Sequence, residues 1–325
     1  MNWGIIATGN IAGKFARTVN AMGAENQRLA AVGSRDLAKA KEFAEKFEIE
    51  TVYKSYEELA ADPNVEAVYI ATPNNLHFEN TLLCLNAGKS VLCEKPFTIK
   101  AEEAKTLYNT AREKGLFVME GFWIRFLPLY DELLKIIGSK KYGELRHARC
   151  EYGFIANEKR RERKFLSELG GGALLDIGVY NLGFLNMVMG GSPEKFDTEV
   201  RLNEFGTDEY SVVQLVYPGG RTAHCLQTIG MNIERRAALY FDGASIYLPD
   251  FQGAYSMTVK PVEGEEYTLD FPPEINGFEY QIREATKCIS AGKTHSDIFR
   301  PEDNIAVLRL MDEIRSRWGL KFKCE

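Results

Sequence analysis

Residues Trp3–Ala12 read Trp-Gly-Ile-Ile-Ala-Thr-Gly-Asn-Ile-Ala, an apolar run that leads through a glycine into a helical pattern. A buried strand, a tight turn and a helix in this order are typical of a unit that binds the pyrophosphate of a dinucleotide. Gly9 would let backbone N–H groups approach the phosphates, and the following helix N-terminus would stabilise their charge. Ala7 departs from the pattern, which has glycine at this position of the turn. The alternative is that this segment is an ordinary strand, turn and helix with no role in binding a dinucleotide.

The first 120 residues alternate short β-rich runs with amphipathic helical patterns. This alternation is typical of βαβ units that build a parallel sheet. Strands are predicted at Trp3–Thr8, Leu29–Ser34, Ala67–Thr72, Ser90–Glu94 and Phe117–Glu120. Helices are predicted at Ile11–Met22, Leu37–Phe47, Tyr56–Ala61, Leu76–Ala87 and Ile99–Lys114, with left-handed caps at Gly23, Gly88 and Gly115. The sequence therefore predicts an α/β domain with a doubly wound parallel sheet of the Rossmann type.

The composition changes after Gly121, where an aromatic-rich stretch begins. A chain of 325 residues fits two domains. We therefore predict a dinucleotide-binding domain over residues 1–121 and a substrate-binding and oligomerisation domain over residues 122–325.

The second domain is predicted to be α+β, with a large, mostly antiparallel open sheet. The runs Tyr210–Tyr217 and Arg221–Ile229 are joined by Pro218-Gly219-Gly220, which is typical of a hairpin. Further strands are predicted at Ala237–Phe241, Ser245–Leu248, Ser256–Val259 and Tyr267–Phe271, and helices at Tyr130–Ile137, Phe278–Ala291 and Pro301–Trp318.

The composition indicates which partners to expect. A net charge of −6 argues against a broad electrostatic attraction to nucleic acid or to anionic lipid, so small molecules are the expected partners. The N-terminus shows no leader pattern, and no apolar window predicts a membrane span, so we expect a cytoplasmic protein. The six cysteines show no C-x-x-C spacing and the four histidines stand far apart, so reduced thiols and no metal site are expected.

The end of the second predicted strand favours NADP over NAD. An acidic residue at this place binds the ribose 2′-OH, whereas an arginine accommodates a 2′-phosphate. Here the strand ends in Ser34 and Arg35, a hydroxyl followed by a planar cation suited to phosphate. The alternative is that Ser34 caps the next helix and Arg35 is a solvated charge. Asp36 complicates the choice because it could reach a ribose instead.

Two further clusters carry candidate catalytic groups. Glu94 and Lys95 stand at the carboxyl end of a buried strand, where open α/β sheets bind ligands, and a proline follows them. A glycine-rich entry at residues 170–172 leads into a helical pattern that carries Asp176 and Tyr180. Their i, i+4 spacing places both side chains on one helix face.

These clusters, with the loops at Ala7–Ala12 and Ala71–His77, resemble the Gfo/Idh/MocA oxidoreductase family over essentially the whole chain. Glu94-Lys95-Pro96 matches the family's catalytic E-K-P motif. Asp176 and Tyr180 match its D-x-x-x-H motif, with tyrosine in place of histidine. With that replacement, the stretch Glu120–Phe126 and the string at residues 169–180, the chain most resembles the branch of trans-dihydrodiol dehydrogenases and NADP-dependent D-xylose dehydrogenases.

The resemblance implies a dehydrogenase that transfers hydride between NADP and a hydroxyl or carbonyl of a sugar or cyclic diol, with NAD possible. Removal of the hydroxyl proton requires a base within hydrogen-bond reach. We assign this role to Tyr180, whose pKa Lys95 would lower from the ordinary value of about 10, with Asp176 orienting Lys95 or binding a substrate hydroxyl. The implied cofactor-binding residues are Thr8, Gly9, Asn10, Ile11, Ser34, Arg35, Thr72, Pro73, Asn74, His77, Glu94 and Lys95, and the implied substrate-binding residues are Trp123, Arg125 and Phe154.

Two other classes of protein are alternatives on this fold. A non-catalytic NADP-binding regulator would have no need of Lys95 and Tyr180, yet both are present. An NAD-dependent glycosidase would keep its cofactor bound and turn over without net reduction. A homodimer through the C-terminal sheet is also expected, because exposed sheet edges and apolar sheet faces are usually covered.

Overall fold

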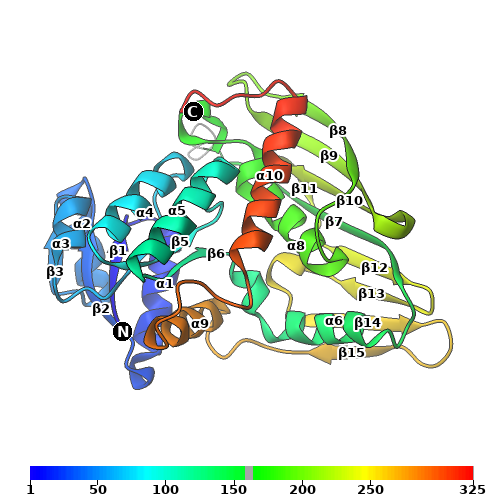
Figure 1. Cartoon of the computed structure of the whole chain (residues 1–325), viewed down its shortest axis with the longest axis horizontal. Helices are drawn as coiled ribbons and strands as arrows, with labels where there is room; N and C mark the ends of the chain where they lie inside the picture. The colour runs from blue at the N-terminus through cyan, green and yellow to red at the C-terminus, as the bar shows by residue number, and fades with distance from the viewer. Residues whose placement is uncertain (158–163, 325) are drawn as a thin grey trace. The chain divides into compact units, whose positions relative to one another are not determined.

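The computed structural model describes residues 1–157 and 164–324, which form two compact units (Figure 1). The first unit contains Met1–Trp123 and Glu274–Pro301. The second contains Ile124–Pro273 and the chain from Glu302 onward.

The first unit is discontinuous in sequence, because α9 (Phe278–Ser290) packs against α1 (Asn10–Ala21). Thr18 on α1 exchanges side-chain hydrogen bonds of 2.8 and 3.1 Å with Asn276, just before α9. The sequence predicts residues 274–301 as part of the second domain, whereas the structure includes them in the first unit. Their place in the first unit depends on contacts across more than 250 positions, which no local pattern reveals.

The first unit is built on a six-stranded sheet in the order β3-β2-β1-β4-β5-β6, and its paired strands are all parallel. Its strands are β1 (Asn2–Ile6), β2 (Arg28–Gly33), β3 (Thr51–Tyr53), β4 (Ala67–Ile70), β5 (Ser90–Glu94) and β6 (Val118–Gly121). The order reverses between β1 and β4, so their carboxyl ends flank the crevice in which doubly wound sheets bind ligands. The doubly wound parallel sheet is confirmed. The sequence missed β3, which has only three residues, all half-buried.

Helices α1, α2 (Leu37–Phe47), α3 (Tyr56–Ala61), α4 (His77–Asn86) and α5 (Ala101–Lys114) connect these strands. Asp36 and Ser55 cap α2 and α3 by accepting backbone N–H groups, which explains why both helices begin where the sequence predicts. The predicted left-handed residues at Gly88 and Gly115 are confirmed, with φ of 80° and 65°. The prediction at Gly23 is wrong, because a 3₁₀ turn begins there and the left-handed residue is Asn26.

The second unit contains a nine-stranded sheet in the order β15-β14-β13-β12-β7-β10-β9-β8, with β11 paired to β7. Its strands are β7 (Leu145–Ile155), β8 (Lys195–Leu202), β9 (Asp208–Tyr217), β10 (Arg221–Thr228), β11 (Gly230–Ile233), β12 (Ala237–Phe241), β13 (Ala244–Leu248), β14 (Ser256–Pro261) and β15 (Tyr267–Asp270). Among the described strand pairs of this second sheet, only β7–β10 is parallel. The predicted mostly antiparallel sheet is therefore confirmed. The predicted hairpin is confirmed too, with Tyr217 paired to Arg221. Strands β7, β8 and β11 were missed.

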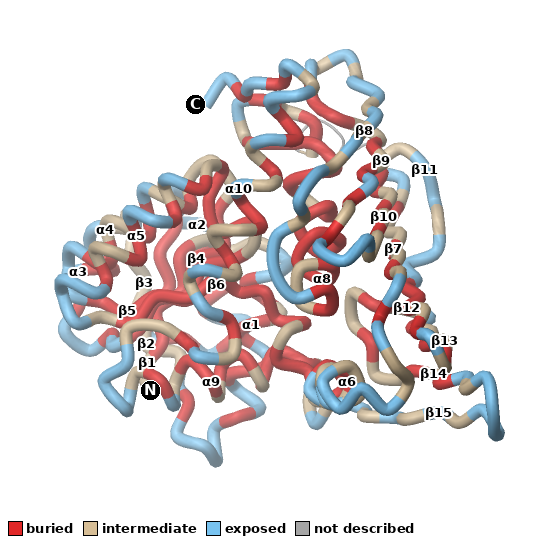
Figure 2. The backbone as a smooth tube through the Cα atoms, turned by 45° about the vertical axis from the view of Figure 1, so that its right-hand side comes forward, coloured by how far each residue is buried: buried red, intermediate tan, exposed pale blue. Residues whose placement is uncertain are grey.

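One face of this sheet packs on helix α8 (Val179–Met189), while α6 (Pro128–Ser139) and α10 (Pro301–Arg317) complete the helices of the unit. Along β7, Ala148 and Cys150 are buried, whereas His147 and Arg149 are half-buried on the other face. The stretch Ser167–Met189 is long and apolar enough to cross a membrane by length and composition, but 83% of its most apolar window lies inside the fold. A core helix meets the same criteria, and α8 is buried along most of its length (Figure 2).

Candidate active site

The predicted cofactor loop lies between β1 and α1 and leaves room for a ligand. Ala7 has a φ of +87°, and its N–H donates to the carbonyl of Gly33 at 3.0 Å. This left-handed conformation explains why the motif has glycine at the position. Among the described residues, no side chain caps the N-terminus of α1, and none has an atom within 4 Å of a Cβ built on Gly9. The loop thus fits a pyrophosphate, because it offers helix N–H groups beside open space. Thr8 is half-buried, and Asn10 and Ile11 are exposed.

At the end of β2, the neighbouring polar side chains have different partners. Asp36 accepts the backbone N–H of Lys39 at 3.1 Å and pairs with the Lys39 ammonium at 3.2 Å. The backbone hydrogen bond from Lys39 is the main reason that the pKa of Asp36 lies below its ordinary value. Ser34 is buried, and its hydroxyl accepts the N–H of Asp36 at 3.2 Å. Asp36 rather than Ser34 therefore caps α2, while Arg35 is exposed and forms no ion pair with the described residues.

The Glu94-Lys95-Pro96 corner follows β5 directly. Glu94 is buried, and its carboxylate accepts the Tyr69 hydroxyl at 2.5 Å. Burial raises the pKa of Glu94, while the Tyr69 hydrogen bond and the charge of Lys95 oppose this shift. Lys95 is half-buried, and the Lys95–Pro96 peptide is cis. The corner thus holds a buried acid and a more accessible cation at the carboxyl edge of the sheet.

His77 joins this corner to the loop after β4. Its Nδ1 lies 2.7 Å from the carbonyl oxygen of Pro96, and its Nε2 lies 3.0 Å from that of Thr72. Burial lowers the pKa of His77 to about 4, although both carbonyls favour the protonated ring. Thr72 is also buried, and its hydroxyl accepts the Asn80 amide at 3.3 Å. The buried His77 ring therefore links the two loops through their backbone carbonyls, whereas Pro73 and Asn74 are half-buried.

The second unit brings three predicted site residues together. Asp176 lies in a π-helical turn (Leu174–Gly178) that continues into α8, where Tyr180 is 5% exposed. Asp176 forms an ion pair with Lys164, whose ammonium lies 5.0 Å from the centre of the Phe154 ring. The ring of Tyr152 lies 6.2 Å from that of Tyr180. Lys164 and Tyr152 were missed by sequence analysis, because neither stands in a motif.

The segment before this turn is fixed by two adjacent buried residues at the start of β9. Thr207 donates its hydroxyl to the carbonyl of Phe165 at 2.7 Å, and Asp208 accepts the N–H of Leu174 at 2.6 Å. Gly172 has a φ of +109°, and a Cβ on it would overlap the Asp208 carboxylate. Burial raises the pKa of Asp208 to about 7 despite its backbone hydrogen bonds. The close approach of the Asp208 carboxylate explains why residue 172 is a glycine. The hydrogen bond from Leu174 to Asp208 also positions the turn that carries Asp176.

The other two predicted substrate-binding residues, Trp123 and Arg125, have partners of their own within the unit to which each belongs. Trp123 belongs to the first unit, is 6% exposed, and packs against the Phe278 ring at 5.4 Å between ring centres. Arg125 belongs to the second unit and forms a 3.1 Å ion pair with Asp131 in the first turn of α6.

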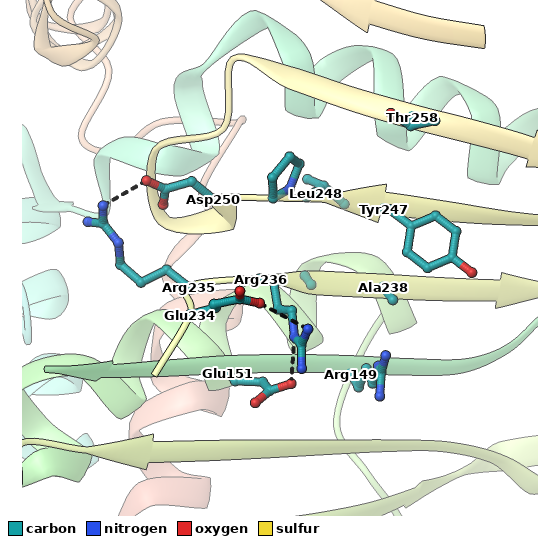
Figure 3. Close-up of a pocket in the computed structure, with 12 residues that line it drawn as sticks. Arg149, Glu151, Glu234, Arg235, Arg236, Ala238, Tyr247, Leu248, Asp250 and Thr258 are labelled. Atoms are coloured by element: carbon teal, nitrogen blue, oxygen red, sulfur yellow. Dashed lines mark hydrogen bonds and ion pairs between the residues drawn. The ribbon is translucent and has the colours of Figure 1, made fainter. Parts of the chain in front are cut away.

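A cavity of about 540 Å³ opens on the face of the second sheet that carries Arg149 (Figure 3). Arg236 contacts Glu151 at 3.0 Å and Glu234 at 2.9 Å, and Arg235 contacts Asp250 at 2.8 Å. The described lining residues include none of the predicted site residues. Within residues 1–157 and 164–324, no group of three His, Cys, Asp or Glu side chains could hold a metal ion.

Residues 1–122 match the family model for the oxidoreductase family with an NAD-binding Rossmann fold, and residues 130–247 match the GFO/IDH/MocA C-terminal domain. The chain belongs to the Gfo/Idh/MocA family. It is similar to the trans-1,2-dihydrobenzene-1,2-diol dehydrogenase of Mus musculus, with 35% identity over 99% of this chain and 98% of that protein. The Homo sapiens enzyme of the same name is 34% identical, again over 99% of this chain and 98% of that protein.

Solved structures agree with this membership. The 3-ketoreductase KijD10 from Actinomadura kijaniata, in complex with NADP and TDP-benzene, has a TM-score of 0.87 at 25% identity and 97% coverage of both chains. The aldose-aldose oxidoreductase from Caulobacter crescentus, complexed with glycerol, has a TM-score of 0.86 at 25% identity and 98% coverage of both chains. This Gfo/Idh/MocA protein is accordingly an oxidoreductase with an NAD(P)-binding domain.

Proposed function

We propose that this chain is an NADP-dependent dehydrogenase of a sugar or cyclic diol, with Tyr180 and Lys95 as its proton-transfer pair. The observation that carries the proposal is the Glu94-Lys95-Pro96 corner at the carboxyl end of β5, beside a cofactor loop with an uncapped helix N-terminus. The names of the relatives support the substrate class, because they act on a dihydrodiol or an aldose.

The end of β2 supports NADP over NAD. Asp36 caps α2 and pairs with Lys39, so its carboxylate already has partners of its own. Arg35 is exposed beside the buried hydroxyl of Ser34. A guanidinium and a hydroxyl are suited to a 2′-phosphate. The solved relative KijD10 was crystallised with NADP.

Each catalytic group has a distinct task in this proposal. NADP accepts or supplies the hydride when it is bound. Tyr180 takes the proton from the substrate hydroxyl, or returns it in the reductive direction. Lys95 stabilises the negative charge that develops on that oxygen. Asp176 is paired with Lys164 and is oriented by it, so this carboxylate can accept a neighbouring substrate hydroxyl.

A substrate panel tests the activity directly. NADP reduction should be measured against aldoses, inositols and cyclic diols, each with NAD in parallel. We expect turnover with at least one member and a preference for NADP. Tight NADP binding without turnover on any member would favour the regulator. Hydrolysis without net reduction would favour the glycosidase.

Two substitutions test the proton-transfer pair. Tyr180→Phe keeps the ring and removes the hydroxyl, so turnover should fall by about 10²–10⁴ while NADP binding survives. Lys95→Met should reduce turnover at least as far, because it removes the charge that stabilises the developing alkoxide. The double variant should be little worse than either single variant, since effects within one unit are not additive. Retained activity in Tyr180→Phe would remove the tyrosine from this role.

We also propose a homodimer through the open face of the second sheet. His147, His224 and Tyr240 lie together on this face, with ring centres 5.1 and 5.9 Å from His147. The cavity in Figure 3, on the same face, is lined by both arginines and carboxylates. A surface that carries both charges can pair with a second copy of itself, as a two-fold interface requires. Light scattering should give twice the chain mass of 36.7 kDa. A concentration-independent monomer would contradict this proposal.

A cytoplasmic location is proposed as well. It is supported by five buried and unpaired cysteines, Cys84, Cys93, Cys150, Cys225 and Cys288, in a fold that uses no covalent crosslink among its described residues. Cell fractionation with an antibody to the chain tests it, and recovery in a secreted or membrane fraction would contradict it.

A further inference from the structure

Lys14 lies on α1, five residues after the glycine of the cofactor loop, and its side chain turns inward. Its ammonium nitrogen lies 4.2 Å from the centre of the Trp123 ring and 3.9 Å from the centre of the Phe278 ring. The two rings also pack on each other, with 5.4 Å between their centres. The ammonium thus contacts two aromatic rings at once, and cation–π attraction strengthens as the cation loses solvent.

Charged groups face Lys14 from three elements. Glu94 approaches from the end of β5, Glu279 from α9, and Arg17 from the next turn of α1. Glu279 is fully buried and accepts the N–H groups of Ile275, Asn276 and Gly277 at 2.7 to 3.1 Å, so it caps the start of α9. Lys14 therefore supplies positive charge to a region with two buried carboxylates, one of which belongs to the Glu94-Lys95-Pro96 corner.

An ordinary surface lysine would not be placed in this way. A lysine that only covers apolar surface keeps its ammonium in water. Lys46 on α2 is such a case, because it is exposed and its ammonium lies 5.6 Å from the ring of its neighbour Phe47. Lys14 instead is half-buried, and burial lowers its pKa to about 8 even though Glu94 and Glu279 favour the charged form.

We propose that Lys14 is a positioning residue for the dehydrogenase reaction, whose ammonium holds Trp123 and the Glu94-Lys95-Pro96 corner in place; this inference rests on the function proposed above. The charge of Lys14 interacts electrostatically with Glu94, so it couples the helix of the cofactor loop to the strand end that carries Lys95. It also fixes the ring of Trp123, the last residue of the first unit before the second begins. Loss of its charge would leave Glu94 with fewer compensating charges and would remove the Lys14 ammonium from the face of the Trp123 ring.

Three variants test this role. Lys14→Met keeps a long apolar side chain and removes the charge, so kcat/KM should fall by about 10- to 100-fold, the range expected for misplaced catalytic groups. Lys14→Arg restores a cation that stacks on aromatic rings and should recover most of that loss. Lys46→Met removes the exposed lysine beside Phe47 and should leave kcat/KM unchanged.

The pH profile distinguishes positioning from a purely structural role. In the wild type, kcat/KM should fall as the pH rises and Lys14 deprotonates near pH 8. Lys14→Arg should lack this alkaline loss, because arginine stays protonated over the whole range. Fluorescence gives a second readout that needs no turnover, since the Lys14 cation lies over Trp123. A change in emission with a midpoint near pH 8 should occur in the wild type and be absent from both Lys14 variants.

The outcomes separate this inference from the proposed function. If Lys95→Met abolishes turnover but Lys14→Met does not change kcat/KM, Lys14 is not a positioning residue and the proposed function stands. If Lys14→Arg is as impaired as Lys14→Met, the charge is not the cause and the inference fails. If the wild type turns over no substrate, the proposed function fails, and the fluorescence titration alone decides whether the ammonium holds Trp123. An emission change that persists in Lys14→Arg belongs to another group and contradicts the inference.

Discussion

Asp208→Asn tests whether a buried carboxylate lowers the stability of the segment that positions Asp176. Asp208 is fully buried, and one of its oxygens accepts the Leu174 N–H at 2.6 Å. Its other oxygen has no hydrogen-bond partner in the described part of the chain. Burial raises the pKa of Asp208 from 3.8 to about 7. Asparagine has nearly the same shape, can still accept the Leu174 N–H and carries no ionisable group.

The sign and size of the effect follow from this shift. Between pH 4 and pH 7 the folded state keeps a proton on Asp208 that the unfolded state has released, so wild-type stability falls as pH rises. Each pH unit in this range changes the free energy of unfolding by about 1.4 kcal/mol. Between pH 5 and pH 7, the stability of Asp208→Asn relative to the wild type should therefore increase by roughly 2 kcal/mol, because the slope flattens as pH approaches the folded pKa, and it should level off above about pH 8.

The measurement is urea unfolding at pH 5, 6, 7 and 8, extrapolated linearly to water for both proteins. Asp242→Asn is the control, because the Arg146 hydrogen bond lowers the pKa of that exposed carboxylate. Because its pKa lies below 3.8, this carboxylate is ionised in both the folded and the unfolded state throughout pH 5–8, so Asp242→Asn should differ from the wild type by the same amount at every pH. Parallel stability curves for Asp208→Asn and the wild type would refute the reasoning.

Three further outcomes are expected. Arg35→Ala should weaken NADP binding by about 1.5–3 kcal/mol and leave NAD binding nearly unchanged, measured by fluorescence titration; equal losses would show that Arg35 is not a phosphate ligand. Ala7→Gly should raise the unfolding free energy by about 1 kcal/mol, since glycine relieves the φ of +87°, and an unchanged or lower melting temperature would contradict this. The His77 ring should stay neutral down to about pH 5 in NMR titrations, because burial lowers its pKa to about 4, and a midpoint near 6.5 would be inconsistent with a buried ring.

The elements that the sequence predicted well are those with strong local signals. Helix α2 and helix α3 have side-chain caps, strand β5 has an apolar centre and is buried at every position, and the β9–β10 hairpin has a Pro-Gly-Gly turn. Strand β3 is too short for a pattern, and β7 interleaves charged residues with its buried ones. Glu94, Lys95, Asp176 and Tyr180 stood out for the same reason, because each lies in a compact motif beside a strand end or a glycine-rich turn.

The sequence by itself thus determined the parallel first sheet, the mostly antiparallel second sheet and the family, since these depend on short-range periodicity and on residues that are adjacent in the chain. Only the tertiary structure decided which groups meet across long distances. It assigned α9 to the first unit, paired Lys164 with Asp176, placed Asp208 under the turn before Tyr180, and set Lys14 between Trp123 and Phe278. The physical reason is that burial, and with it the pKa of Lys14, His77 and Asp208, is set by neighbours that are remote in sequence and brought close only by packing.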